Sequence, residues 1–122
     1  MTKDYDFSGL WHSSYNYLDT ASGKRYNSEH DVKIHKTDNN LIMQSEPNEE
    51  KSYILMRLTL DEDILTGTWQ EESSPTGRYR GETYYGAMQL IIGNDGDSML
   101  GKWVGRDRKN QVQCGEWKII RN

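Results

Sequence analysis

The feature that most constrains this chain is a two-residue alternation of apolar and polar side chains, repeated in short runs along most of its length. In the clearest run, residues 53–60, one face of a strand would carry Ile54, Met56, Leu58 and Leu60. Apolar residues do not recur at helical spacing, so the pattern favours strands. It predicts eight of them, at residues 9–17, 30–36, 41–46, 53–60, 64–70, 83–92, 98–105 and 112–120.

The connections between the predicted strands are mostly short. Five of the seven contain three to six residues, at 37–40, 47–52, 61–63, 93–97 and 106–111. Loops of this length join antiparallel neighbours. Two longer segments, 18–29 and 71–82, are polar and contain glycine, and we expect them to act as lids over an opening.

Eight antiparallel strands in an open sheet would leave two edges free to pair with other molecules. Eight is also the number at which a closed barrel holds either packed side chains or one small ligand. We therefore expect one all-β domain over residues 1–122, an eight-stranded antiparallel up-and-down barrel with residues 1–8 as a short N-terminal extension. A two-sheet sandwich is the alternative.

Charge and cysteine content narrow the function. Lys and Arg number 15 against 19 Asp and Glu, and the resulting net charge of -4 disfavours binding to duplex nucleic acid. Cys114 is the single cysteine, which excludes an internal disulfide and fits a reducing compartment. The N-terminus has no apolar run of signal-peptide length, and no stretch reaches the roughly 20 apolar residues of a membrane span. We expect a cytoplasmic protein without membrane contact.

Short motifs in the predicted strands resemble those of calycin barrels, the lipocalins, fatty-acid-binding proteins and avidins. Gly9-Leu10-Trp11 matches the Gly-x-Trp that opens these barrels, and Arg121 stands where lipocalins place an arginine against that tryptophan. The runs 65–69 and 100–105 look like the Leu-x-Gly-x-aromatic strands of avidin-type barrels, and 115–117 closes the series. The resemblance implies a calycin-like barrel.

A longer stretch, about residues 9–120, resembles a bacterial domain often found C-terminal to helix-turn-helix regulators. The matching runs are 66–69, 74–81, 84–90 and 101–105. In outline the chain is also similar to the β-barrel sensor of two-transmembrane effectors in cyclic-oligonucleotide antiviral signalling. These resemblances imply a nucleotide-like ligand. Because the sequence contains neither a helix-turn-helix nor a membrane span, any output that those parts provide is absent or supplied by a partner protein.

Four tryptophans lie in four different predicted strands: Trp11, Trp69, Trp103 and Trp117. Indoles that line one cavity can stack on a base, a sugar or a fused ring. The other interpretation is that they fill the core, because only 34% of the residues are hydrophobic and bulky rings are needed to pack it. Both interpretations stay open.

Polar candidates lie in one loop and in several strands. Arg78, Tyr79 and Arg80 stand on a glycine-flanked loop, where guanidinium groups would suit phosphate or carboxylate unless the flanking glutamates neutralise them. Gln89 and Lys102 interrupt apolar strands, so each either finds a buried partner or points outward.

Tyrosine hydroxyls offer recognition with few charges. Tyr15 and Tyr84 occupy strand positions from which a hydroxyl can reach a cavity, although tyrosines in strands are more often structural. His30 and His35 are five residues apart, so alternation places them on opposite faces and argues against a metal site within that strand.

Support for catalysis is weak. The chain has no nucleophile elbow, zinc-protease helix, phosphate loop or dinucleotide fingerprint. A carboxylate such as Glu71 or Glu116 is the remaining acid–base candidate, and we expect Cys114 to be a buried structural thiol. We predict no catalytic residue, no metal and no cofactor.

We predict a non-catalytic, small-molecule-binding barrel, a sensor or sequestering protein for a nucleotide-like or other aromatic or anionic ligand. Its predicted site comprises Trp11, Tyr15, Trp69, Tyr79, Arg80, Tyr84, Gln89, Lys102, Trp103 and Trp117. One alternative is a filled barrel that binds a protein partner or a second copy of itself. The other is an enzyme, which would require a carboxylate and a polar partner to converge inside the barrel.

Overall fold

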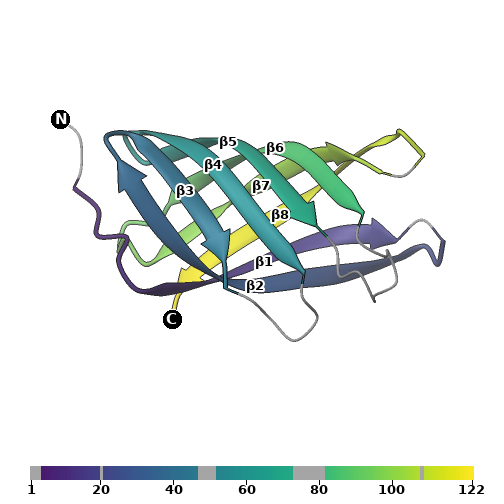
Figure 1. Ribbon diagram of the computed structural model, residues 1–122, viewed down its shortest axis with the longest axis horizontal. Coiled ribbons are helices and arrows are strands. Elements are labelled where there is room, and N and C mark those ends of the chain that lie inside the picture. The colour runs from purple at the N-terminus through teal and green to yellow at the C-terminus, as the bar shows by residue number, and fades with distance from the viewer. Residues whose placement is uncertain (1–3, 20, 47–51, 73–81, 108) are drawn as a thin grey trace.

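A computed structural model describes residues 4–19, 21–46, 52–72, 82–107 and 109–122 (Figure 1). Its strands are β1 (Leu10–Asp19), β2 (Lys24–Thr37), β3 (Asn40–Ser45), β4 (Tyr53–Asp61), β5 (Ile64–Glu72), β6 (Thr83–Ile92), β7 (Ser98–Arg106) and β8 (Val112–Arg121). Each strand pairs antiparallel with the next, and β8 pairs with β1, so the sheet closes into a barrel. The predicted fold class is confirmed, and the sandwich alternative is wrong.

The barrel closes where β1 meets β8, and this seam is one of the two shortest ladders, the other being that between β3 and β4. Its ladder has five pairs, from Trp11 with Arg121 to Tyr15 with Trp117. The β1–β2 ladder has ten pairs. The backbone therefore closes the seam at the end of the barrel where both chain termini lie (left in Figure 1).

Side chains close the seam beyond the last backbone pair. The Asn16 side-chain oxygen accepts a hydrogen bond from Nη2 of Arg25 at 2.7 Å, and the same guanidinium nitrogen lies 3.3 Å from the carbonyl oxygen of Cys114. Nε1 of Trp103 donates to the carbonyl oxygen of Asn16 at 2.9 Å. Beyond the last backbone pair, hydrogen bonds of an amide, a guanidinium and an indole therefore hold the seam together.

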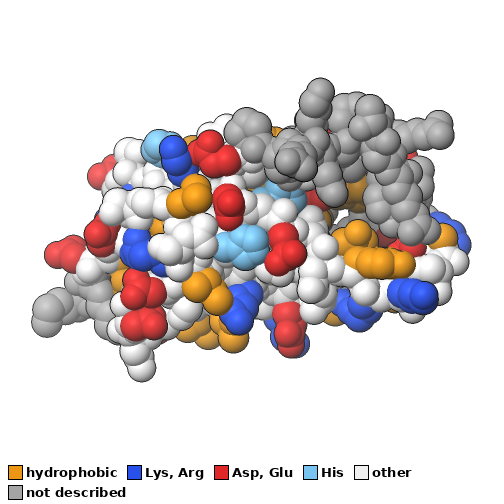
Figure 2. All heavy atoms as spheres, turned by 90° about the horizontal axis from the view of Figure 1, so that it is seen from below, with side chains coloured by type: hydrophobic (Ala, Val, Ile, Leu, Met, Phe, Trp, Pro, Cys, Tyr) orange, Lys and Arg blue, Asp and Glu red, His pale blue; other side chains and the backbone are white. Residues whose placement is uncertain are grey.

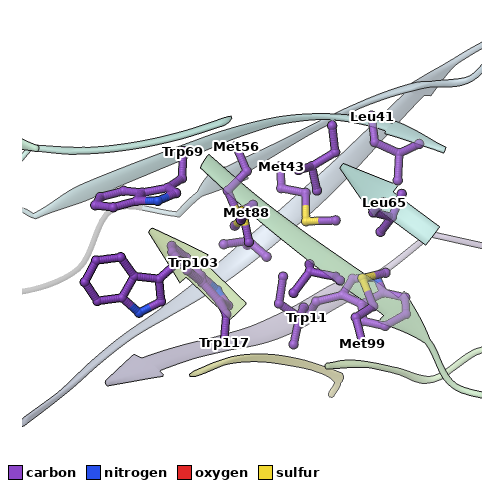
Figure 3. Packing of buried hydrophobic residues seen from close by; sticks show 14 of the residues in the cluster. Trp11, Leu41, Met43, Met56, Leu65, Trp69, Met88, Met99, Trp103 and Trp117 are labelled. Atoms are coloured by element: carbon purple, nitrogen blue, oxygen red, sulfur yellow. The ribbon is translucent and has the colours of Figure 1, made fainter. Parts of the chain in front are cut away.

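Alternation sends one face of every strand into a single core. In the part of the chain that the structure describes, nineteen hydrophobic side chains are buried there: Phe7, Trp11, Tyr15, Val32, Leu41, Met43, Ile54, Met56, Leu58, Leu60, Leu65, Trp69, Met88, Leu90, Ile92, Met99, Trp103, Trp117 and Ile119. Figure 3 shows three tryptophans gathered at one end of this core and Trp11 at the other, with methionines between them. The two ends of the barrel are therefore built differently.

The first predicted lid, residues 18–29, is wrong. Leu18 and Asp19 end β1, and β2 begins at Lys24, so most of this segment lengthens a hairpin (Figure 1). Carboxylate oxygens of Asp19 accept hydrogen bonds from the Ala21 backbone and the Ser22 hydroxyl in the turn. The prediction failed because this part of β2 is polar on both faces, so alternation gives no signal there.

The second predicted lid, residues 71–82, starts inside a strand. Glu71 and Glu72 belong to β5, and residues 73–81 lie outside the described residues. None of the described segments forms an apolar helix of membrane-spanning length.

The outer face of β1 and β2 is polar, and Figure 2 shows histidine and acidic side chains side by side on it. Nδ1 of His12 lies 3.0 Å from a carboxylate oxygen of Asp31, and its Nε2 lies 3.1 Å from one of Glu29. The hydrogen bond with Asp31 raises the pKa of His12 the most, followed by that with Glu29. Cys114 is exposed on the outer face of β8, so the expectation of a buried thiol is wrong.

Arg121 closes the end of the barrel at which the termini lie. Its Cζ lies 4.2 Å from the centroid of the Trp11 ring, and its Nε donates to Asp97 at 2.7 Å. The other guanidinium nitrogens donate to the carbonyl oxygens of Ser8 and Asp6. One side chain therefore holds the N-terminal segment, the β6–β7 turn and the core tryptophan together.

Replacing this guanidinium should destabilise the whole barrel. We expect Arg121→Ala to lower the free energy of unfolding by about 1.5–3 kcal/mol, because charge-assisted hydrogen bonds and a cation–π contact are lost together. Urea unfolding monitored by tryptophan fluorescence measures the change. The control is Arg106→Ala, which removes an exposed guanidinium with a hydrogen bond to Asn110 and should change stability by less than about 0.5 kcal/mol. Equal losses in the two variants would contradict the assignment.

Candidate functional site

The end of the barrel opposite Arg121 is filled by a cluster of aromatic rings. The rings of Tyr15 and Trp117 stack with centroids 4.3 Å apart, and those of Trp69 and Trp103 meet edge to face at 5.4 Å. Tyr15 also lies 6.0 Å from Trp69. Figure 3 shows the three indoles approaching one another from β5, β7 and β8. The rings pack on each other and form a continuous aromatic layer across the interior.

Two inward-facing glycines make room for this layer. A Cβ at Gly86 would lie 2.4 Å from Nε1 of Trp69, and a Cβ at Gly115 would lie 2.7 Å from Nε1 of Trp103. Any larger residue at either position would displace an indole. Nε1 of Trp69 is buried, and among the described residues it has no hydrogen-bond partner.

A carboxyl group lies directly against the aromatic layer. Glu71, near the end of β5, accepts a hydrogen bond from the hydroxyl of Tyr15 on β1. The hydroxyl of Ser28 on β2 lies 3.4 Å from each of its carboxyl oxygens. Since β1 and β5 lie on opposite walls of the closed barrel, the Tyr15–Glu71 bond crosses the interior. These three side chains form what we call the polar floor.

Burial sets the protonation of the polar floor. Glu71 and Tyr15 retain 9% and 7% of their accessible surface. Burial raises the pKa of Glu71, and the hydrogen bonds from Tyr15 and Ser28 only partly offset this effect by favouring the carboxylate. Burial, and then the neighbouring Glu71 charge, also raises the pKa of the Tyr15 hydroxyl well above its ordinary value. Tyr15 is thus a neutral donor, and Glu71 is an acid that holds its proton more tightly than a carboxyl in water.

Tyrosines continue the aromatic lining from the polar floor toward the tip of the β1–β2 hairpin. Tyr17 and Tyr84 are partly buried against the core. The ring of Tyr17 lies 6.0 Å from that of Tyr15 and 6.1 Å from that of Tyr26. The hydroxyl of Tyr84 donates to Glu82 at 3.1 Å. Tyrosine rings therefore lie between the polar floor and the tip of this hairpin.

A buried histidine lies on the β2 side of this end. Nε2 of His30 lies 2.8 Å from the hydroxyl of Ser52, and its Nδ1 has no hydrogen-bond partner among the described residues. Burial lowers the pKa of His30, which keeps the ring neutral at physiological pH. Within the described ranges, no group of three or more His, Cys, Asp or Glu side chains is arranged to hold a metal ion.

The structure brings together four of the predicted site residues, Tyr15, Trp69, Trp103 and Trp117. Tyr84 lies at the rim of the same end. Trp11 lies elsewhere, at the closed end, where its Nε1 donates to the carbonyl oxygen of Phe7 at 3.1 Å. Trp11 therefore belongs to the closure around Arg121 and not to this cluster.

The predicted polar residues lie outside the cluster. Gln89 and Lys102 are exposed on the outer faces of β6 and β7, and the Gln89 amide donates to Thr66 at 3.1 Å. Alternation explains this position, because their neighbours Met88 and Trp103 point inward. The predicted residues 79 and 80 lie outside the described residues.

Sequence reasoning named Glu71 only as a remote acid–base candidate and did not consider Ser28. A signal for Glu71 was present, because it follows Trp69 by two residues and is in phase with Leu65 on the inward face of β5. The predicted strand ended one residue too early to use it. Ser28 lies in the segment that was predicted to be a lid, so no signal pointed to it.

These features define the class of the molecule: a closed, eight-stranded antiparallel barrel with an aromatic interior and a buried carboxyl group near one end. No protein-family model and no curated protein matches the sequence. Among solved structures, the chain is similar to a mutant of the vaccine antigen Transferrin Binding Protein B from Haemophilus parasuis Hp5, with a TM-score of 0.53 and 10% identity. The match covers 96% of this chain and 27% of that one, and it shows the fold.

Glu71 should make the stability of the protein depend on pH. Because its pKa is raised on folding, the folded state holds a proton that the unfolded state releases, so stability falls as the pH rises from the unfolded to the folded pKa. We expect Glu71→Gln to remove this fall and to be the more stable protein above that window, by about 1.4 kcal/mol for each tenfold difference in proton affinity.

Urea unfolding at several pH values between about 4 and 8 checks this prediction. The matched control is Glu72→Gln, which removes an exposed carboxyl from the next position of the same strand. Its stability should follow the wild-type pH dependence. A Glu71→Gln profile parallel to the wild-type profile would show that Glu71 titrates as it would in water.

Proposed function

We propose that this protein is a non-catalytic barrel that binds a small organic molecule at the polar floor. The observation that carries the proposal is the Tyr15–Glu71 hydrogen bond inside the aromatic interior, at a depth where both side chains still touch solvent. A buried carboxyl group costs free energy that an apolar side chain of similar size would not. Polar groups converging among aromatic rings are typical of ligand sites.

The surroundings of the polar floor bear on the ligand class. The aromatic rings support a ligand with a flat or apolar body, of which a nucleobase is one example. The described residues do not support a phosphate-bearing ligand near Glu71, because no described Lys or Arg side chain forms an ion pair with the Glu71 carboxyl group. The nucleotide-like ligand stays a prediction and enters the test below as one class of compound.

A thermal-shift screen should find the ligand class. Compounds with one aromatic ring and an amine, hydroxyl, carboxylate or phosphate group would be tested, together with AMP and cyclic oligonucleotides. A true ligand should stabilise the protein by about 2.7 kcal/mol at a hundred times its Kd. It should also change the fluorescence of the clustered tryptophans.

Two variants locate the binding. Tyr15→Phe removes one hydroxyl from the polar floor, and we expect it to weaken binding about fivefold, since a hydrogen bond contributes about 1 kcal/mol. Lys102→Ala changes an exposed side chain on the outer face of β7 and should leave the affinity unchanged. A ligand sensitive to Lys102→Ala but not to Tyr15→Phe would contradict the proposal, as would a screen without any hit.

The same geometry meets the condition stated for an enzyme, because a carboxyl group and two hydroxyls converge inside the barrel. Mass spectrometry of the compound after incubation separates the two functions. A binding protein returns it unchanged, and turnover would contradict the non-catalytic proposal.

A second candidate function is self-association through the outer face of β5, β6 and β7. Ile64 pairs with Ile91, and Ile91 pairs with Leu100, so three apolar side chains form one row across the strands. Ile91 and Leu100 expose 54% and 60% of their surface. Contiguous apolar surface of this kind marks interaction sites on soluble proteins.

Light scattering of the eluting protein tests this candidate. At high concentration we expect a mass above the 14.2 kDa of one chain. Leu100→Lys should shift the protein to the monomer, because it places a charge in the row. Gln44→Lys, which adds the same charge on the outer face of β3, away from this surface, should not. A wild-type protein that is monomeric at every concentration would contradict self-association.

A further inference from the structure

The polar floor has spare capacity to accept hydrogen bonds. A carboxylate offers about four acceptor positions. Tyr15 donates to one Glu71 oxygen, and Ser28 is within 3.4 Å of both. Each hydroxyl has one hydrogen to give, so an ionised Glu71 could accept further donors. A ligand that fills the floor should therefore bring donors, and an ammonium group brings three.

Among the described residues, the carboxyl groups buried at this end of the barrel are those of Glu71 and Asp19, whereas the Lys24 and Arg25 side chains are exposed at the hairpin tip. Asp19, at the end of β1, is the other acidic side chain buried there, with 4% of its surface exposed. In the part of the chain that the structure describes, no Lys or Arg forms an ion pair with Glu71. An anionic ligand would add a like charge to a site of low dielectric, and a cation would supply the opposite one.

The rings beside the carboxyl group suit a cation as well. Tyr15 and Tyr17 lie on β1 with ring centroids 6.0 Å apart, and Trp69 lies two residues before Glu71 on β5. The face of an indole or a phenol carries partial negative charge and attracts ammonium groups within about 6 Å. The aromatic layer and the carboxyl group therefore favour the same ligand class.

We infer that the polar floor binds a small organic cation, an ammonium group carried on an aromatic or apolar body, which donates to Glu71 and rests on the neighbouring rings. This inference rests on the proposed function and names its ligand class. A cation beside the carboxyl group opposes the effect of burial on the pKa of Glu71, so over the pH range in which Glu71 titrates, binding is accompanied by proton release.

The proton can be assigned to Glu71 among the groups around it. Among the described residues, the titratable side chains on the inward face at this end are Tyr15, Tyr17, Asp19, Tyr26, His30, Glu71 and Tyr84, with Glu82 bonded to Tyr84 and Lys24 paired with Asp19 at the hairpin tip. The neighbour of Glu71 on β4 is Ile54, which does not titrate. His30 is already neutral because burial lowers its pKa, and burial raises the pKa of Tyr15, so neither releases a proton near neutral pH.

Three probes that share a phenylalkyl group and differ in charge isolate the effect of ligand charge on affinity. Isothermal titration of the full chain would compare 2-phenylethylamine, 2-phenylethanol and 3-phenylpropionate, which carry a cation, a neutral group and an anion. We expect the amine to bind about tenfold more tightly than either of the others. Titrations in buffers of different ionisation enthalpy, at several pH values across the range in which Glu71 titrates, should show proton release with the amine and none with the alcohol.

Matched variants test the role of Glu71. Glu71→Gln keeps the shape and the neutral hydrogen bonds but removes the charge, so amine affinity should fall about tenfold or more, while alcohol affinity should change less than about twofold. Glu72→Gln removes an exposed carboxyl one residue away and should leave amine affinity unchanged. Circular dichroism and the melting temperature of Glu71→Gln confirm that the barrel is intact.

The outcomes separate the inference from the proposed function. The inference is overturned if the alcohol, the acid or AMP binds as tightly as the amine, or if Glu71→Gln keeps its amine affinity, and the binding function then stands. If the amine does not bind and the wider screen finds another ligand, the cation class alone fails. If the screen finds no ligand either, both fail.

Discussion

The pairing of β8 with β1 is the constraint on which the rest of the structure depends. Without it the sheet would expose two edges to other chains. The last pair of this ladder joins Tyr15 to Trp117, and the rings of the same two residues stack at 4.3 Å. The final step of barrel closure and the centre of the aromatic cluster are therefore one contact. A sequence change that opened the seam at this point would also disperse the rings and release the Tyr15 hydroxyl from Glu71.

The aromatic interior explains why glycines occupy inward positions in a barrel with few aliphatic residues. Gly86 is the β6 partner of Trp69 and Gly115 is the β8 partner of Trp103, so each of these indoles lies against a position that has no side chain. This arrangement replaces the usual interdigitation of aliphatic chains by rings packed on backbone. It also explains how Trp103 reaches past β8 to the carbonyl oxygen of Asn16 and helps to hold the seam that the backbone leaves unpaired.

Most of the fold was predictable because its strands are buried on one face only. Alternation located all eight strands, and the predicted contact of Arg121 with Trp11 is present. It failed for the first half of β2, where both faces are polar and only backbone pairing specifies the strand. Within the site, the clustered rings were foreseeable. The role of Glu71 was not, because burial of a carboxyl near a strand end depends on Tyr15, which is 56 residues away.

The two ends of the barrel differ in the partners that they provide for a charged or ionisable side chain. This contrast distinguishes a structural role from a functional one. At the closed end, Arg121 has a carboxylate, two carbonyl oxygens and an indole as partners, so the contacts of its guanidinium group stabilise the fold. At the other end, the described hydrogen-bond partners of Glu71 are hydroxyl groups, and no described Lys or Arg forms an ion pair with its carboxyl group. A fold that needed only packing there would be served better by an apolar side chain. The buried carboxyl group is therefore the observation on which the proposed binding function rests.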